Sequence, residues 1–130
     1  MITDIVTLCH SATIVNNQIS MLGAFDTIFI KSVPSPYPAF TAVVRAYFSP
    51  DEIGIHRLIL RIVDPDGRTL GEMNLELSFV EESFDPKLTL CIALPINGME
   101  LRCLGEYAID LILDDNEPIR MPFYVKQVRQ

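Results

Sequence analysis

The residues of this chain whose types could carry chemistry are an Asp-Pro-Asp-Gly stretch, two histidines and three cysteines. Asp64 and Asp66 stand beside a proline and a glycine, as carboxylates do in calcium-binding loops. With Asp64 at the first position of an EF-hand loop, Arg68 and Leu75 would occupy ligand positions, so the calcium pattern fails. Aspartate, proline and glycine in this order are typical of a type I turn. Residues 64–67 therefore predict a turn and not a cation site.

The two histidines are in phase with apolar residues of predicted strands, His10 with Leu8 and His56 with Leu58. A histidine in such a phase could be a buried metal ligand, a general base, or a hydrogen-bonded side chain near the end of a sheet. Neither histidine has a third ligand at a matching spacing, and Cys9 points to the strand face opposite His10. The sequence favours the hydrogen-bonded interpretation and leaves His10 and His56 as candidate functional residues.

No nucleophile or phosphate-binding motif accompanies the histidines. The chain contains no G-x-S-x-G, no H-E-x-x-H and no glycine-rich phosphate loop. Cys91 and Cys103 lie in apolar surroundings, which raise the pKa of a thiol and make it less reactive. We therefore predict no catalytic residue, no metal site and no bound cofactor.

The charge balance is acidic, with 17 acidic and 10 basic residues and a net charge of −7. Nucleic-acid binding requires clustered Lys and Arg, and anionic lipid repels an acidic surface. Residues 1–10 lack the basic start and apolar run of a signal peptide, and no apolar run approaches the roughly 20 residues that span a bilayer. An odd number of widely spaced cysteines fits a reducing compartment. These features predict a cytoplasmic protein that binds neither nucleic acid nor membrane.

Apolar residues recur at a period of two along most of the chain, which predicts strands. The dipeptide Asn16-Asn17 predicts a two-residue hairpin turn, because Asn tolerates positive φ at both central positions. That turn sets Val15 opposite Gln18 and brings the apolar phases of both strands into agreement. The register of this N-terminal hairpin is therefore fixed by two independent features.

Two further hairpins are predicted, and in the C-terminal one the apolar phases of both strands again coincide. The C-terminal turn places Leu113 opposite Ile119, and Pro122 marks the last strand as an edge strand or a bulged one. Around the Asp-Pro-Asp-Gly turn, the apolar phases require Leu60 opposite Gly71. This pairing needs either a two-residue loop or a bulge, for which Gly71 is the natural place.

About eight short strands with turn signals between them predict an all-β fold. We expect an immunoglobulin-like two-sheet β-sandwich of about eight antiparallel strands, with a small β-barrel as the alternative. A single domain covers residues 1–130. The proline-rich segment at residues 33–38 is expected to cross between the sheets.

Tyrosine, phenylalanine and proline gather near the ends of several predicted strands. An exposed apolar surface for a second copy or another protein could be formed by Tyr37, Phe40, Tyr47 and Tyr124. The alternative is that these rings pack in the core and on the sheet faces.

Three segments, GAFDTIFI, GIHRLILRIVDPDGRTL and GEYAIDLILDD, resemble a family of small bacterial proteins of unknown function. Its members share an N-terminal strand pair ending in G-x-F-D, a G-x-H strand that runs into a D-P-D-G turn, and a G-E-Y strand near the C-terminus. The resemblance spans the whole chain. It implies a β-sandwich and a bacterial cytoplasmic protein, and it implies no activity and no site.

These observations leave three functional hypotheses. The favoured one is a non-enzymatic β-sandwich that binds another protein or a second copy of itself, so a homodimer is expected. The alternative is a small-ligand or carbohydrate-binding module in which Tyr37, Tyr47 and Tyr124 form a stacking platform. The least favoured hypothesis is a hydrolase-type enzyme with His10 or His56 as its base.

Overall fold

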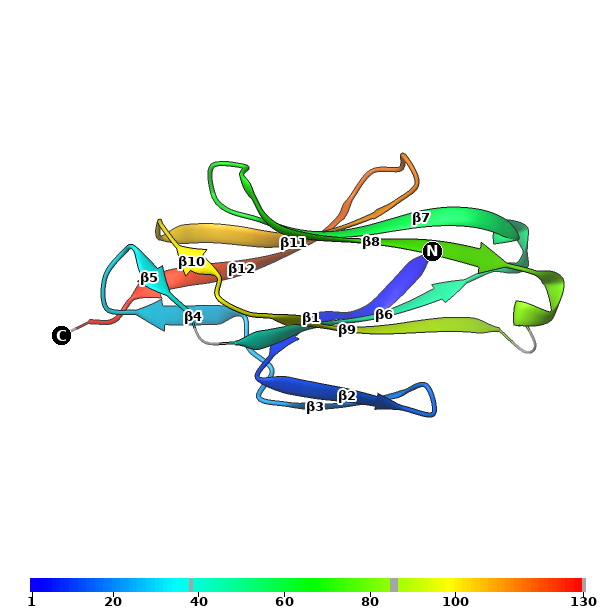
Figure 1. Cartoon of the computed structure of the whole chain (residues 1–130), viewed down its shortest axis with the longest axis horizontal. Coiled ribbons are helices and arrows are strands. Elements are labelled where there is room, and N and C mark those ends of the chain that lie inside the picture. Colours follow the sequence, from blue (N-terminus) through cyan, green and yellow to red (C-terminus); the bar gives the residue numbers. More distant parts are fainter. Residues whose placement is uncertain (38, 85–86, 130) are drawn as a thin grey trace.

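The computed structural model describes residues 1–37, 39–84 and 87–129, and in this part of the chain eight strands form two layers (Figure 1). One layer has three strands, in the order β1 (Ile2–Cys9), β6 (Phe40–Phe48) and β9 (Leu88–Ile96). The other has five, in the order β4 (Thr27–Ile30), β12 (Ile119–Gln127), β11 (Gly105–Leu113), β7 (Gly54–Val63) and β8 (Thr69–Phe79). The predicted all-β sandwich is confirmed.

Smaller elements lie outside the two layers. A hairpin of β2 (Ser11–Val15) and β3 (Gln18–Leu22) lies against the outer side of the three-stranded layer and contacts β6 and β9 (Figure 1). A short ribbon pairs β5 (Ser35–Pro36) with β10 (Glu100–Leu101). The helical elements are two 3₁₀ turns, η1 (Pro50–Glu52) and η2 (Glu81–Phe84), and no helix of the described residues could span a bilayer.

The core fills the space between the layers and follows the alternation of each strand. On β6, Phe40 and Val44 point inward and are each 1% exposed. The opposite face of this strand is also buried, since Thr41 and Val43 lie on the side that the β2–β3 hairpin covers. Full burial of an aliphatic side chain contributes about 1.5–3 kcal/mol. The central strand therefore holds both the sandwich and the hairpin in place.

The order of strands follows the immunoglobulin plan. The chain starts in the three-stranded layer as β1, antiparallel to β6, and crosses after the hairpin to the other layer. There β4 pairs with the last strand, β12, in parallel. This parallel pair is the one departure from the predicted antiparallel pairing among the described strands.

A buried tyrosine fixes the connection that leads into β11. Tyr107 is 1% exposed, and its hydroxyl donates a hydrogen bond to the backbone carbonyl of Cys103 at 2.7 Å. Burial raises the pKa of Tyr107 to about 12, so the hydroxyl keeps its proton at neutral pH. This arrangement is the tyrosine corner of immunoglobulin-like sandwiches.

The N-terminal hairpin has the predicted register. Val15 pairs with Gln18, and Asn16 and Asn17 have φ values of 51° and 58°. Positive φ at both positions is the signature of a type I′ turn, whose twist matches that of the flanking strands.

The C-terminal hairpin has the predicted apolar phase but a different register. Ile119 pairs with Leu111, and the predicted pairing with Leu113 is wrong. Leu113 pairs instead with β7, and the next amide, that of Asp114, donates to the carbonyl of Arg57 at 2.7 Å. Pairing with β7 therefore extends β11 to Leu113, two residues past its last pair with β12, so the loop between β11 and β12 is longer than predicted.

The Asp-Pro-Asp-Gly stretch is a turn, as predicted. The amide of Gly67 donates to the carbonyl of Asp64 at 3.0 Å, and the amide of Asp64 donates to the carbonyl of Arg68 at 2.9 Å. Gly67 has a φ of 83°, a left-handed conformation that favours glycine. The turn therefore closes with one residue more than a two-residue loop.

A bulge on β8 restores the apolar phase after this turn. The register shifts between Thr69 and Gly71, which leaves Leu70 without a cross-strand partner. The irregularity lies beside Gly71, as expected. It adds its residue on the β8 side, so Leu60 faces Met73 and the predicted pair of Leu60 with Gly71 is wrong.

The segment between β4 and β6 crosses from the five-stranded to the three-stranded layer, which confirms that prediction for residues 33–37. Pro38 lies outside the described residues. Strand β12 lies between β11 and β4 and is therefore not the edge of its sheet, contrary to one interpretation of Pro122. Because β4 pairs only with residues 124–127 of β12, the side of the strand away from β11 lacks a paired strand at Pro122 in the described structure.

Candidate functional site

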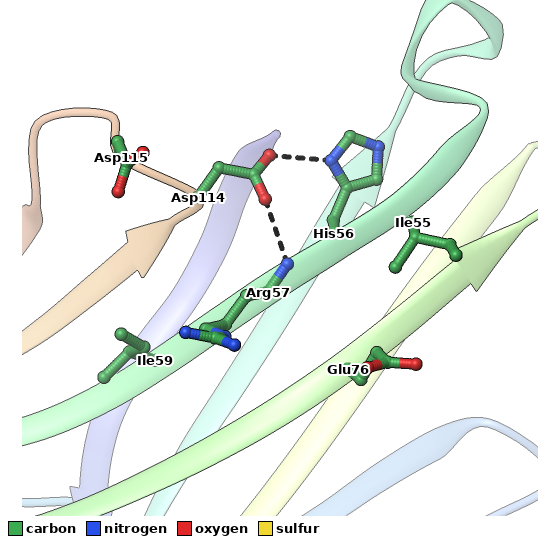
Figure 2. A pocket seen from close by; sticks show the side chains of 7 residues that line it. All are labelled: Ile55, His56, Arg57, Ile59, Glu76, Asp114 and Asp115. Carbon is green, nitrogen blue, oxygen red and sulfur yellow. Dashed lines mark hydrogen bonds and ion pairs between the residues drawn. The ribbon is translucent and has the colours of Figure 1, made fainter.

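His56 lies at the rim of an open depression where β7 meets the turn between β11 and β12 (Figure 2). The depression has a volume of about 330 Å³. Its lining residues are Ile55, His56, Arg57, Ile59, Glu76, Asp114 and Asp115. Arg57 and Glu76, which both line it, are cross-strand partners on β7 and β8, so residues of opposite charge lie side by side there.

Both ring nitrogens of His56 have hydrogen-bond partners within the protein. Nδ1 lies 2.7 Å from Asp114 Oδ2, and Nε2 lies 2.6 Å from the backbone carbonyl of Glu52 (Figure 2 shows the first contact). Both partners are acceptors, so both nitrogens can donate only when the ring is protonated. The bond with Asp114 and then that with Glu52 raise the pKa of His56.

Asp114 is held in place by β7. Its Oδ1 accepts a hydrogen bond from the amide of Arg57 at 3.0 Å, and its own φ is 54°, which aspartate tolerates better than most residues. The hydrogen bond with His56 lowers the pKa of Asp114. The pair therefore joins β7, η1 and the β11–β12 turn as a positioned ion pair with both ring nitrogens occupied.

His10 lies in a different part of the chain, between β1 and β2, and is exposed. Its ring packs on Phe25 with centroids 5.4 Å apart, and it lies so close to Gly23 that an added Cβ there would be 2.3 Å from the ring. The structure thus does not bring the two candidate histidines into one site. Neither lies in the core, and the predicted hydrogen-bonded role near a sheet end is confirmed for His56.

Three residues of metal-ligating types lie together at the Asp-Pro-Asp-Gly turn. Ligand atoms of Asp64, Asp66 and Cys103 lie within 4.8 Å of one another, a combination that the sequence did not reveal. Asp64 Oδ1, however, accepts hydrogen bonds from the amides of Asp66 at 2.9 Å and Arg68 at 2.8 Å. These bonds account for the buried carboxylate as a part of the turn.

The three cysteines are free thiols, with Cys9 buried and Cys91 and Cys103 half-buried. Burial raises the pKa of Cys9 and of Cys91, which lowers the thiolate fraction of both at neutral pH. The raised pKa of Cys91 agrees with the prediction, whereas its surroundings are not apolar, since its cross-strand partner is Arg45.

The predicted aromatic surface of Tyr37, Phe40, Tyr47 and Tyr124 is not formed as one patch. Phe40 is 1% exposed and lies in the core, so including it was wrong. The alternation of β6 did indicate this, because Ala42, Val44 and Ala46 share the phase of Phe40, whereas Arg45 and Tyr47 lie in the other phase. Tyr37 packs on Phe40, with ring centroids 5.7 Å apart.

The other two tyrosines lie on opposite layers. Tyr47 is on β6, where its hydroxyl donates to Asp4 at 2.7 Å and Lys87 lies 4.3 Å from the ring centroid. Tyr124 is on β12 of the five-stranded layer. These rings therefore do not share a surface.

The sandwich has two long open edges on one side. In the residues that the structure describes, β8 pairs only with β7, and β9 pairs only with β6 (Figure 1). Their inward side chains are half-buried, namely Met73, Leu75 and Leu77 on β8 and Leu88, Leu90, Leu94 and Ile96 on β9. The neighbouring inward residues Leu58 and Leu60 of β7 are each 1% exposed. Apolar surface is therefore left uncovered between the two edges.

An apolar cleft of about 220 Å³ marks one end of this region. Residues of β7, β8 and β9 line it, among them Leu60, Leu70 and Leu94. This region was not predicted from the sequence. The signal available was the run Leu88–Ile96, which contains no charged residue and lies on an edge strand.

A comparison with known protein families matches residues 4–126 to a family described as "Family of unknown function (DUF6941)". A comparison with curated proteins found no match.

Proposed function

The chain belongs to this family of unknown function, and from its structure we propose that it is a non-enzymatic protein-interaction module that binds through the open edges of its sandwich. The observation that carries the proposal is that β8 and β9 each have one free edge in the described residues. Proteins commonly guard such edges with charges, prolines or covering segments, because exposed edges recruit other strands. Here the edges also leave apolar side chains half-buried.

The arrangement of polar groups supports a role without catalysis. A general base needs a ring nitrogen that can take a proton from a substrate. Both nitrogens of His56 are occupied by Asp114 and Glu52, and the residues that line its depression include no serine, threonine or cysteine. The stacking platform of the ligand-binding alternative gains no support. Tyr47 lies on β6 of one layer, Tyr124 lies on β12 of the other, and Tyr37 lies in the segment between β5 and β6.

The partner is a second copy of the chain or another protein, and a cytoplasmic setting in a bacterium is part of the proposal. The three free thiols fit a reducing compartment. The net charge of −7 disfavours a nucleic-acid partner.

The test combines light scattering over a range of concentrations with identification of proteins that co-purify with the tagged chain. We expect either a dimer or a reproducible partner, and Leu75→Lys should weaken the association because it places a charge at the β8 edge. Ile55→Lys is the matched control, since Ile55 is 72% exposed and lies on β7 in the phase opposite to the inward Leu58. A monomer at every concentration together with no reproducible partner would refute the proposal.

A further inference from the structure

The five-stranded layer ends on one side with β8, and the three-stranded layer ends with β9. The inward residues Leu75 and Met73 of β8 are half-buried, whereas their cross-strand partners Leu58 and Leu60 are each 1% exposed. The inward side chains are therefore fully buried on β7 and only half-buried on the adjacent β8. We call the region between the inward face of β8 and the free edge of β9 the notch.

The free edge of β9 offers a defined set of hydrogen-bonding groups. Pro95 lies opposite Thr41 of β6. Because proline has no N–H, this is a position at which the backbone nitrogen and carbonyl of β9 point away from β6. Every second residue shares that direction, which turns the backbone groups of Thr89, Cys91 and Ala93 toward the open edge.

A second contact supports this direction. The side-chain amide of Asn17 donates a hydrogen bond to the carbonyl of Thr89 at 3.2 Å, which places that carbonyl on the side away from the β6 ladder. The amides of Thr89, Cys91 and Ala93 and the carbonyls of Cys91, Ala93 and Pro95 are then the groups that an added strand can use.

The charge of the chain favours a segment of another protein over a second copy. A second copy would carry the same net charge of −7, and like charges across an interface oppose association. A single extended segment can lie beside β9 and beneath β8.

The charges around the notch favour a segment without acidic residues. Strand β9 carries no charge, Glu72 beside the apolar cleft is paired with Arg61 at 3.1 Å, and the exposed Glu81 and Glu82 lie on η2 between β8 and β9. Lys87 is the basic residue next to the start of β9, and the chain as a whole has a net charge of −7. Opposite charges across an interface favour association.

We propose that the notch receives one extended segment of a partner protein, which adds to β9 as a further strand and alternates apolar side chains with basic or neutral ones. Its apolar side chains cover Met73, Leu75 and Leu77 of β8, and its backbone pairs with the free groups of β9. This proposal rests on the proposed function and specifies its site and the chemistry of its partner.

The edge can be tested on the free protein by residue-resolved hydrogen exchange. We expect the amides of Thr89, Cys91 and Ala93 to exchange at least about tenfold faster than those of Ile92 and Leu94, which face β6. Uniformly slow exchange in a monomer would overturn the open edge. Slow exchange in a dimer would show that a second copy occupies the edge. That result would overturn the notch as a site for a single strand, and it would still support the proposed interaction module.

Binding is tested with synthetic peptides of the length of β9, 9 residues, added to the full chain. A peptide that alternates valine and lysine should bind and slow the exchange of the three edge amides. A peptide of the same composition with contiguous valines, and one that alternates valine and glutamate, should each bind at least about tenfold more weakly. Equal affinity for all three peptides would overturn the proposal.

Ala93→Pro removes one outward amide and leaves the β6 ladder intact, as Pro95 already does. We expect it to weaken peptide binding by about fivefold or more, whereas Ala93→Ser, which keeps the amide, should bind normally. Slow exchange at Ile92 would verify that the proline variant is folded. Unchanged peptide binding by the folded proline variant would refute the notch, while a dimer or a reproducible partner in the earlier test would leave the interaction module standing.

Discussion

Replacing His56 by glutamine should make the stability of the protein less dependent on pH near neutrality. Glutamine cannot carry the positive charge that the wild-type ring needs to donate to both Asp114 and the carbonyl of Glu52. Because these two contacts raise the folded-state pKa of His56 above its ordinary value of 6.5, the folded protein binds the proton more tightly than the unfolded chain does.

The sign of the effect follows from proton linkage. Where the folded state binds more protons, the free energy of unfolding decreases as the pH increases. The stabilisation from His56 is therefore complete below a pH of about 6.5 and is lost as the pH rises through the raised folded-state pKa. The lowered pKa of Asp114 acts at the other end, since its stabilisation is lost in acid as the carboxylate takes up a proton.

The magnitude is limited by exposure. The His56 side chain is 17% exposed and that of Asp114 is 43% exposed, so solvent screens the pair. Exposed ion pairs contribute about 0.2–1 kcal/mol, and a hydrogen bond to a charged group contributes about 1.5 kcal/mol or more when it is better buried. We therefore expect about 1 kcal/mol at a pH of about 5.5, which is a few degrees in melting temperature for a chain of this size.

The assay is urea unfolding of the wild type and His56→Gln at several pH values between about 5.5 and 8.5. The difference between the two proteins should be largest at the acidic end and shrink toward the alkaline end, because contributions from other titrating groups cancel in the subtraction. Asp114→Asn is the matched variant and should reduce the same dependence. A difference that stays constant or increases with pH would mean that the folded ring is neutral, which would refute the argument from its two acceptor partners.

Two further predictions concern packing. Tyr107→Phe should lower the free energy of unfolding by about 1–2 kcal/mol in urea titrations, since it leaves the carbonyl of Cys103 without its 2.7 Å donor. Gly23→Ala should cost more than Gly67→Ala: both glycines have positive φ, which costs about 1–2 kcal/mol, but only Gly23 faces a ring, that of His10, at 2.3 Å. His10→Ala in the Gly23→Ala background should recover the excess, and equal losses for the two glycine variants would contradict the clash.

The parts of the fold that could be predicted are those in which a local signal fixes geometry. Asn16 and Asn17 require a two-residue turn, and the apolar phases on both sides accept no other register, so the N-terminal hairpin was predicted residue by residue. At the C-terminal hairpin the turn residues do not determine the loop length. There the register is decided by β7, which pairs with Leu113 and the amide of Asp114 from more than 50 residues away.

The candidate site could be predicted only in part, for a similar reason. The phase of His56 indicated a hydrogen-bonded side chain, but its partners come from Glu52 and Asp114, and the alternation of β7 contains no information about either. Phe40 shares its phase on β6 with the apolar Ala42 and Val44, so its place in the core was predictable from the alternation. The burial of the opposite face was not, because the hairpin that covers it packs from another part of the chain.

The two open edges differ in a way that bears on their roles. Strand β8 carries Glu72 and Glu76, charges of the kind that discourage unspecific strand pairing, whereas β9 has none over its 9 residues. Strand β9 is restricted by other means: Pro95 removes a donor, and Asn17 occupies the carbonyl of Thr89. With fewer free backbone groups, the edge of β9 pairs poorly with a long strand of another protein. It retains free groups for a short ladder centred on Cys91 and Ala93. That combination resists aggregation and still admits one extended segment, which is the behaviour that the notch requires.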